Sequence, residues 1–264
     1  MITPDERRAG LLRYLRRRPL AFALWRYSEI MALAPLDWSG RILDLGCGDG
    51  LFGEIVFSGR NVVGVDGDAY ELGLARQRGV YRELVRGDIH SLPLPDASFD
   101  HVFSNCVVEH LDDPPRVFRE VRRVLQPGGR FVFTVPSERF AELLTGSRVL
   151  ARLRRYDLSR FYGDLANRIL DQKHTLSEKQ WRALLEPAGF DRITARYYAG
   201  PAVAAAFDTG GLIAAGSLIG RRLTARWIVP RKGALAAYLI ERLVGDGAPA
   251  TGAGLLVEAR AAGS

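Results

Sequence analysis

Short apolar runs alternate with segments of helical spacing from residue 41 onward. Several runs are nearly continuous in Val, Ile, Leu and Phe, which is typical of strands buried on both faces. Five strands are expected in this part of the chain: 41–45, 61–65, 83–86, 101–104 and 130–135. Three helices are expected between them: 51–58, 69–78 and 114–125. The alternation predicts an α/β fold with a parallel, doubly wound sheet, which binds ligands at the carboxyl ends of its strands.

The chain before this alternation has a helical pattern. Residues 11–34 carry apolar and basic positions at helical spacing, and Pro19 marks a break between two helices. We therefore expect an N-terminal helical cap over residues 1–40, followed by the main domain over 41–264. A polar and aromatic stretch at about 138–175 predicts a helical lid over the carboxyl edge of the sheet.

The last part of the chain adds a helix, two strands and an insertion. The pattern predicts a helix over 177–188 and strands over 191–198 and 254–260. The two strands are separated by about fifty residues, which is far longer than a hairpin loop. Residues of about 200–250 are therefore interpreted as a helical insertion before the last strand.

Composition and charge limit the class of protein without selecting a partner. The chain has 264 residues, of which 47% are hydrophobic and 25% charged, which predicts one core-bearing domain with elaborations. The formal net charge of +7 permits nucleic acid, a lipid head group or a phosphorylated substrate as partner. One dense basic run is either a solvated helix face or an anion-contacting surface: Arg13, Arg16, Arg17 and Arg18.

Targeting signals and metal ligands have no clear pattern in the sequence. The first ten residues lack the apolar core of a secretory signal, so we expect a cytoplasmic protein, with the inner face of a membrane as the alternative. The apolar stretch at 202–220 is interrupted by Asp208 and by glycines, which makes it a poor membrane span. Cys47 and Cys106 form no CxxC pair, which favours a reducing compartment and predicts no bound metal.

The strongest chemical signal is the run RILDLGCGDG at residues 41–50, where a strand leads directly into a glycine-rich turn. Glycines let the backbone approach a ligand and accept positive φ, and Asp44 is placed to meet a cationic group. Gly48, Gly50 and Gly53 also fit the dinucleotide pattern G-x-G-x-x-G. Asp66 ends the second strand about twenty residues on, where an acid can bind ribose hydroxyls, as in nicotinamide enzymes too. Both interpretations remain open at this point.

Further motifs favour one of the two. The run RGDI at residues 86–89 places Asp88 at a strand end, where its carboxylate can accept a hydrogen bond from an adenine amino group. The fourth strand region at 98–105 and the run VLQPGGRF at 124–131 follow in order. With these motifs the sequence resembles the class I S-adenosylmethionine-dependent methyltransferases, in the branch that contains many small-molecule enzymes. The resemblance covers about residues 41–137, with weaker similarity at 174–190 and in the last strand.

The resemblance implies a fold, a cofactor and a binding site. It implies a Rossmann-like, seven-stranded sheet whose last strand runs antiparallel beside the fifth. It implies S-adenosyl-L-methionine as the cofactor, with Asp66 at the ribose and Asp88 and Ile89 at the adenine. The expected cofactor residues are Asp44, Gly46, Cys47, Gly48, Gly50, Asp66, Gly67, Asp88, Ile89 and Asn105.

The acceptor side of the site carries less sequence information. A hydroxyl nucleophile has to lose its proton, and His110, with Glu109 beside it just after the fourth strand, is the candidate base. The alternative is that this pair only orients the following loop. Related quinone-pathway O-methyltransferases carry an additional Glu that helps to hold a divalent metal, and Cys106 takes that place here. His174, Tyr156 and Tyr162 are expected near the substrate, although aromatic residues at helical spacing are more often core.

Several alternatives remain for the whole protein. The insertion at 200–250 combines apolar positions with basic residues, so it fits a lid, a homodimer contact or peripheral membrane contact. A nicotinamide-dependent oxidoreductase would share the glycine turn, and a non-catalytic partner protein could retain the fold. Residues 104–107 lack an amino-methylating tetrad, so no nucleic acid is expected. We expect methylation of a small molecule, with a hydroxyl of a natural product, sugar or lipid-linked acceptor as the methylated group.

Overall fold

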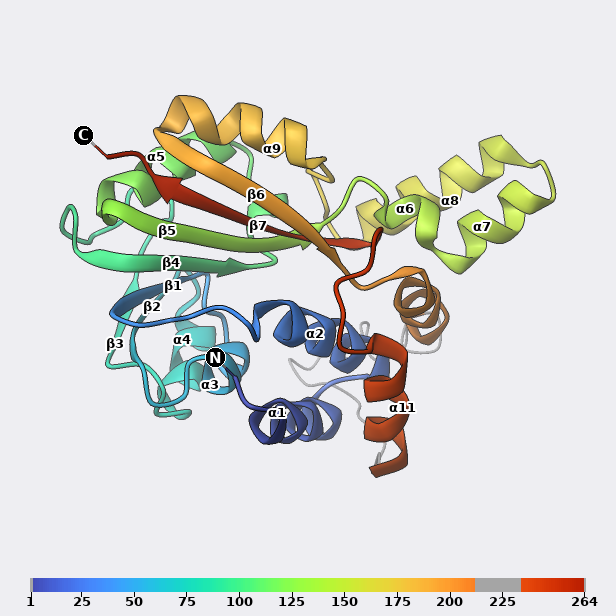
Figure 1. Cartoon of the computed structure of the whole chain (residues 1–264), viewed down its shortest axis with the longest axis horizontal. Helices are drawn as coiled ribbons and strands as arrows, with labels where there is room; N and C mark the ends of the chain where they lie inside the picture. The colour runs from blue at the N-terminus through green and yellow to red at the C-terminus, as the bar shows by residue number, and fades with distance from the viewer. Residues whose placement is uncertain (1, 212–233, 264) are drawn as a thin grey trace.

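The structure is a computed structural model that describes residues 2–211 and 234–263. In this part of the chain one sheet has the strand order β3-β2-β1-β4-β5-β7-β6 (Figure 1). Its strands are β1 Arg41–Leu45, β2 Asn61–Asp66, β3 Glu83–Arg86, β4 Phe99–Asn105, β5 Leu125–Pro136, β6 Phe190–Tyr198 and β7 Gly254–Ala261.

Helices precede, separate and extend the strands, and residues 201–211 are also helical. Those in the first half are α1 Pro4–Arg17, α2 Leu20–Leu33, α3 Leu51–Val56, α4 Ala69–Arg76, the 3-10 helix η1 Val108–His110 and α5 Pro114–Val124. Those that follow are α6 Phe140–Leu143, α7 Thr145–Arg152, α8 Tyr156–Ile169, α9 Glu178–Leu185, the 3-10 helix η2 Glu186–Ala188 and α11 Ala234–Val244.

Strand pairing confirms the predicted seven-stranded sheet. β3, β2, β1, β4 and β5 pair in parallel, so their carboxyl ends meet at one edge. β7 lies antiparallel between β5 and β6, as the resemblance implied for the last strand. The predicted turn before the fifth strand is an irregularity inside β5, where the register shifts between the pairs Phe99 with Leu125 and His101 with Arg130.

Both faces of the sheet are buried, which explains the continuous apolar runs. Neighbouring residues of a strand face opposite sides, so Ile42 joins a core under α1, α2 and α3 whereas Leu43 joins one under α5 and α9. Phe118 and Trp181 anchor these last two helices. Figure 1 shows α5 and α9 on one side of the sheet and α1 to α4 on the other.

Local signals set most helix ends, and one was missed. Pro19 separates α1 from α2, as predicted. The expected start of α1 at residue 11 is wrong, because Thr3 and Glu6 form a capping box that starts the helix at Pro4. The helix predicted over 177–188 is α9 followed by η2, and it ends at Gly189 in the left-handed conformation.

Helices lie in both regions predicted as helical additions, and the role of the first as a lid stays a prediction. α6, α7 and α8 fall in the expected lid region, but α7 and α8 extend away from the sheet as a hairpin (Figure 1). In the insertion, helix 201–211 and α11 are described. The basic residues noted there, and the tryptophan among them, lie outside the described residues: Arg221, Arg222, Arg226, Arg231, Lys232 and Trp227. Among described helices, none has both the length and the apolar character needed to cross a membrane.

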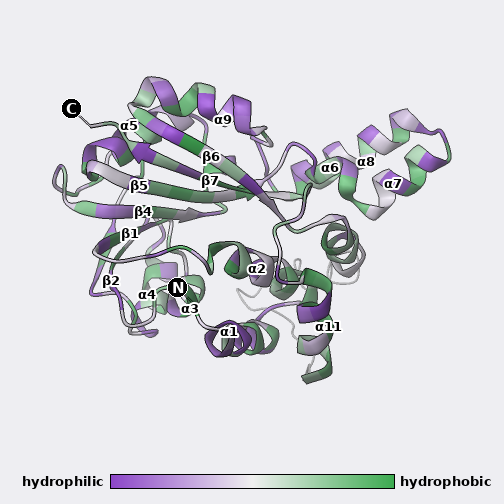
Figure 2. Cartoon of the chain, in the orientation of Figure 1, coloured by the Kyte–Doolittle hydropathy of each residue, from purple (hydrophilic) through white to green (hydrophobic). Residues whose placement is uncertain are grey.

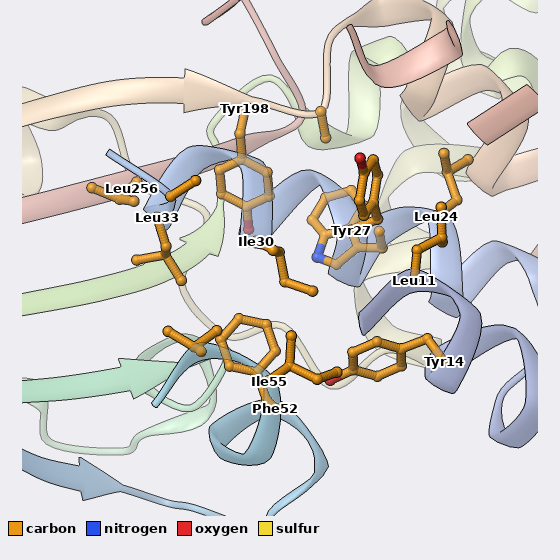
Figure 3. Close-up of a cluster of buried hydrophobic side chains, with 14 of the residues drawn as sticks. Leu11, Tyr14, Leu24, Tyr27, Ile30, Leu33, Phe52, Ile55, Tyr198 and Leu256 are labelled. Carbon is orange, nitrogen blue, oxygen red and sulfur yellow. The ribbon is translucent and has the colours of Figure 1, made fainter. Parts of the chain in front are cut away.

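A buried charge joins α2 to the sheet. Glu29 is fully buried, and its Oε1 accepts hydrogen bonds from Trp25 Nε1 at 2.9 Å, Cys106 Sγ at 3.0 Å and the Tyr198 hydroxyl at 3.2 Å. Its Oε2 pairs with an Arg26 guanidinium nitrogen at 2.8 Å. We call these five residues the Glu29 cluster. Figure 3 shows Tyr198 reaching from β6 toward Ile30 of α2.

We predict that Glu29→Ala lowers the free energy of unfolding by about 3–5 kcal/mol, because it leaves a partly buried guanidinium and three further donors without their acceptor. Urea denaturation measures the loss. Glu142→Ala is the control, since its ion pair with Arg139 lies at the surface and is worth at most about 1 kcal/mol. Equal losses in the two variants would contradict a structural role for the buried cluster.

Candidate functional site

The glycine-rich turn between β1 and α3 is held by the end of β2. The backbone N–H groups of Gly46 and Cys47 both donate to the Val65 carbonyl, at 2.8 and 3.0 Å. The N–H of Gly48 donates to Asp66 Oδ2 at 2.8 Å. Three consecutive amides of the turn are therefore fixed to the neighbouring strand.

Two of the glycines in this turn are required for different reasons. Gly46 has a φ of 76°, and a Cβ there would lie 2.5 Å from Val107 Cγ2, so a side chain would collide with Val107, two residues after the end of β4. Gly48 has a φ of 52°, but a Cβ there would meet no atom within 4 Å. The backbone of the turn thus packs against the protein at Gly46, whereas at Gly48 it faces open space.

Two cavities meet at Gly46. The first holds about 300 Å³ and is lined by the turn, α1, α2 and the end of β4. The second is an open cleft of about 700 Å³ at the ends of β2 and β3. Of the predicted cofactor residues, Asp44, Gly46, Cys47, Gly48 and Asn105 line the first. Gly46, Asp66, Gly67, Asp88 and Ile89 line the second. Gly50 lines neither, and caps α3 in the left-handed conformation.

Asp44 is a buried acid at the floor of the first cavity. It is 4% exposed, and the Tyr81 hydroxyl donates to its Oδ2 at 2.7 Å. Burial raises the pKa of Asp44 to about 7; the charge of Asp66 adds to the rise, and the hydrogen bond from Tyr81 opposes it. A cationic ligand group would remove much of this cost of ionisation, as expected for the ammonium group of S-adenosylmethionine.

The two acids of the open cleft already accept hydrogen bonds within the protein. Asp66 Oδ1 accepts from the Asp68 N–H at 2.9 Å, while its Oδ2 binds the turn. Asp88 Oδ1 accepts from the backbone N–H of His90 at 2.8 Å and lies 2.8 Å from that residue's Nδ1. The backbone hydrogen bond is the main reason that the pKa of Asp88 lies below its usual value. Both carboxylates are therefore held in place by hydrogen bonds where they line the cleft.

The wall opposite the turn comes from α1 and α2 and was not predicted. Tyr14, Arg18, Phe22 and Arg26 line the first cavity. Arg26 donates to Asn105 Oδ1 at 2.5 Å, and Asn105 Nδ2 donates to the Thr134 hydroxyl at 2.6 Å. Arg18 and Arg26 line the same cavity as Asp44, so its lining carries side chains of both signs of charge.

The basic run of α1 is mostly paired within the protein. Arg18 binds Asp49 of the glycine turn at 2.6 Å, and Arg78 binds the same carboxylate at 3.1 Å. Arg13 and Arg17 pair with Glu54 of α3 at 2.8 and 3.6 Å. Three of the four arginines therefore attach α1 to the turn and to α3. The sequence had suggested a solvated helix face or an anion-contacting surface, and neither describes these ion pairs.

Glu109 is buried beside the Glu29 cluster and does not line either cavity. Burial raises its pKa to about 8. Its Oε2 is buried without a hydrogen-bond partner among the described residues. Its backbone carbonyl accepts from the N–H groups of Lys173 and His174 at 2.9 and 3.1 Å, which ties the chain after α8 to η1.

His110 is partly exposed at the end of η1. Its Nδ1 lies 2.7 Å from the carbonyl oxygen of Asp171, and its Nε2 lies 3.9 Å from Glu109 Oε1. A carbonyl can only accept, so Nδ1 carries the hydrogen and Nε2 is left as the proton acceptor. His110 follows Val107, which lines the open cleft, by three positions, although His110 itself is not part of the lining.

The three predicted substrate residues lie apart from both cavities. His174 Nε2 is 2.8 Å from the Leu111 carbonyl, so this ring holds the loop after η1. Tyr162 donates to Asp208 Oδ1 at 2.7 Å. Tyr156 is exposed at the start of α8. Their contact with a substrate stays a prediction.

Comparison with known proteins identifies the class. Residues 43–133 match the family model of a methyltransferase domain. A malonyl-[acyl-carrier protein] O-methyltransferase from Pectobacterium atrosepticum is 37% identical over 106 residues, which cover 40% of this chain and 42% of that protein. The chain thus aligns with less than half the length of this relative.

Solved structures share the fold over most of the chain. A Thermotoga maritima SAM-dependent methyltransferase, described as a possible histamine N-methyltransferase, has a TM-score of 0.55 at 22% identity and covers 89% of each chain. The [4+2]-cyclase SpnF has a TM-score of 0.55 at 19% identity, covering 90% of this chain and 82% of its own. Residues 43–133 are thus a methyltransferase domain, and the chain as a whole has the fold of the class I S-adenosylmethionine-dependent methyltransferases. S-adenosylmethionine is the cofactor of this class.

We predict that affinity for S-adenosylhomocysteine falls as the pH is lowered through about 7, the pKa of Asp44. The ammonium group of the ligand binds the ionised carboxylate, so a proton has to leave Asp44 on binding, and affinity decreases by about tenfold per pH unit below that pKa. Calorimetric titration across this range measures the slope. Asp44→Asn should bind more weakly above pH 7 and lose the slope, whereas an unchanged affinity profile in that variant would contradict the assignment.

Proposed function

We propose that the protein transfers a methyl group from S-adenosylmethionine to an oxygen atom of a small acceptor. The observation that carries this proposal is the meeting of two cavities at Gly46, one with a buried acid and one with two strand-end acids. A ligand with a cationic amino-acid end and a polar nucleoside end matches this pair of cavities. A dinucleotide has no ammonium group to place beside the buried Asp44.

In this proposal each half of the cofactor has its own set of residues. Asp44, Gly48 and Asn105 would hold the methionine part, and Asp66, Asp88 and Ile89 would hold the adenosine part. The bound cofactor supplies a methyl group that is already activated by its positive sulfur. The protein therefore has to align the acceptor and exclude water, and α1 and α2 cover the first cavity for that purpose.

We assign His110 as the base that removes the proton of the acceptor hydroxyl. Its Nε2 is free to accept because Nδ1 faces the Asp171 carbonyl. Glu109 keeps its proton at neutral pH, since burial raises its pKa to about 8. We therefore assign Glu109 a positioning role, through the carbonyl that binds the segment after α8, and not the role of a base.

Oxygen is favoured as the acceptor atom by the name of the Pectobacterium relative, an O-methyltransferase that acts on a malonyl-[acyl-carrier protein]. A hydroxyl acceptor requires a base, whereas a carboxylate acceptor is already ionised at neutral pH. The role of His110 therefore distinguishes the two kinds of oxygen.

We predict that His110→Gln lowers kcat by about 10²- to 10⁴-fold, because a hydroxyl acceptor loses its general base. The dissociation constant of S-adenosylhomocysteine should change by no more than about twofold, since His110 lines neither cavity. Steady-state kinetics and calorimetry give the two values. An unchanged kcat would contradict the hydroxyl assignment and favour an acceptor that is already ionised.

The proposed activity itself is tested by ligand stabilisation and by turnover. S-adenosylhomocysteine in hundredfold excess over its dissociation constant should stabilise the fold by about 2.7 kcal/mol, and NAD should not. Labelled methyl should then pass from the cofactor to hydroxylated small molecules. Stabilisation by NAD would favour the oxidoreductase, and stabilisation by S-adenosylhomocysteine without any transfer would contradict methyltransferase activity.

A further inference from the structure

The hairpin of α7 and α8 exposes a set of large apolar side chains. They are Val149, Leu153, Tyr156, Leu158, Phe161, Leu165 and Ile169. Leu153 is 66% exposed, and Tyr156 and Phe161 are each 59% exposed. Single exposed apolar residues are common on proteins, but a contiguous group marks an interaction surface.

The exposed apolar residues of α8 are not its packing face. Leu158, Phe161, Leu165 and Ile169 follow one another at three or four positions, so they share one side of the helix. The side that packs on the body carries Tyr162, Ala166 and Leu170. The apolar row is therefore additional to the residues that attach α8 to the protein.

The hairpin has a defined shape. The Ser159 hydroxyl donates to the Ser147 carbonyl at 2.9 Å, which joins α8 to α7. The Tyr162 hydroxyl and the N–H of Gly146 both donate to Asp208, at 2.7 and 3.1 Å, which joins the hairpin to helix 201–211. Figure 1 shows α7 and α8 extending away from the sheet, and neither helix contributes a residue to the lining of the two cavities that meet at Gly46.

Positive charge surrounds the apolar residues. Between Thr145 and Ile169 the chain has six arginines and two aspartates. Five of the arginines are exposed and form no ion pair with any described residue: Arg152, Arg154, Arg155, Arg160 and Arg168. Figure 2 shows hydrophilic and hydrophobic residues side by side over both helices. An anionic counterpart is thus missing within the described protein.

We propose that the α7–α8 hairpin docks the protein on an anionic lipid bilayer. The apolar row enters the boundary between head groups and acyl chains, and the arginines remain at the level of the lipid phosphates. This arrangement satisfies both properties of the surface, which a neutral bilayer or a purely charged partner would not. A second copy of the hairpin fits poorly, because it would place like charges opposite each other.

Vesicle flotation with the full chain tests the proposal and needs neither cofactor nor acceptor, so its outcome is independent of the proposed methyl transfer. The vesicles consist of phosphatidylcholine alone, or of phosphatidylcholine with part replaced by phosphatidylglycerol. We expect the protein to float only with the phosphatidylglycerol vesicles. The double variant R152E/R160E should lower the bound fraction by about tenfold or more, because four units of charge change at the membrane surface.

Matched controls separate the hairpin from the rest of the surface. F161S/I169S should also reduce binding, whereas L235S/L239S, at exposed apolar positions of α11, should not. R16E/R119E makes the same change of charge as R152E/R160E at exposed positions of α1 and α5, and should leave binding close to wild type. A second assay detects insertion directly. Brominated phosphatidylglycerol should quench the fluorescence of the tryptophan added in Phe161→Trp but not that of the tryptophan added in Leu239→Trp.

Three results would overturn the proposal. One is an absence of flotation with either kind of vesicle. Another is vesicle binding that stays unchanged in both hairpin variants, or that falls by the same factor in the control variants. The third is a dimer, measured by light scattering, that F161S/I169S dissociates, since the apolar row would then be a contact between two copies.

Discussion

The attachment of the glycine turn to the end of β2 is the constraint on which the site depends. The carbonyl of Val65 and the carboxylate of Asp66 hold three consecutive amides of the turn, so the register between β1 and β2 sets the shape of the cofactor loop. Asp66 therefore has two roles: its carboxylate accepts a hydrogen bond that holds the turn, and it also lines the open cleft. A shift of that register would displace both the turn and the acid that we assign to the ribose.

The second constraint is electrostatic. Glu29 of α2 contributes a fully buried carboxylate. Arg26 of the same helix pairs with it and donates to Asn105 at the end of β4. A helix that precedes the sheet in the sequence thus becomes the wall of the first cavity, and ion pairs from α1 to Asp49 and Glu54 secure it from the other side. The cavity is closed by charged residues whose partners are within the protein, so Asp44 remains the acid that lacks a cationic partner there among the described residues.

Most of the fold and the turn could be predicted because their signals are local. Strands buried on both faces give continuous apolar runs, and a strand leading into Gly46, Gly48 and Gly50 specifies both conformation and position. The cavity wall could not be predicted, because Arg26 meets Asn105 across 79 positions and Tyr81 meets Asp44 across 37. The outward direction of α7 and α8 was likewise not in the pattern, since spacing predicts a helix but not the body on which it packs. The assigned roles of His110 and His174 rest on proximity in the sequence and stay predictions.

A crystal structure with S-adenosylhomocysteine tests the central claim most directly, namely that the turn and the three strand-end acids surround a single ligand. The account predicts that the ligand passes Gly46, with its amino group at Asp44, its ribose hydroxyls at Asp66 and its adenine beside Ile89 and Asp88. Electron density for the ligand at any other surface, or its absence from a crystal grown with the ligand well above the concentrations that class members require, would contradict the account.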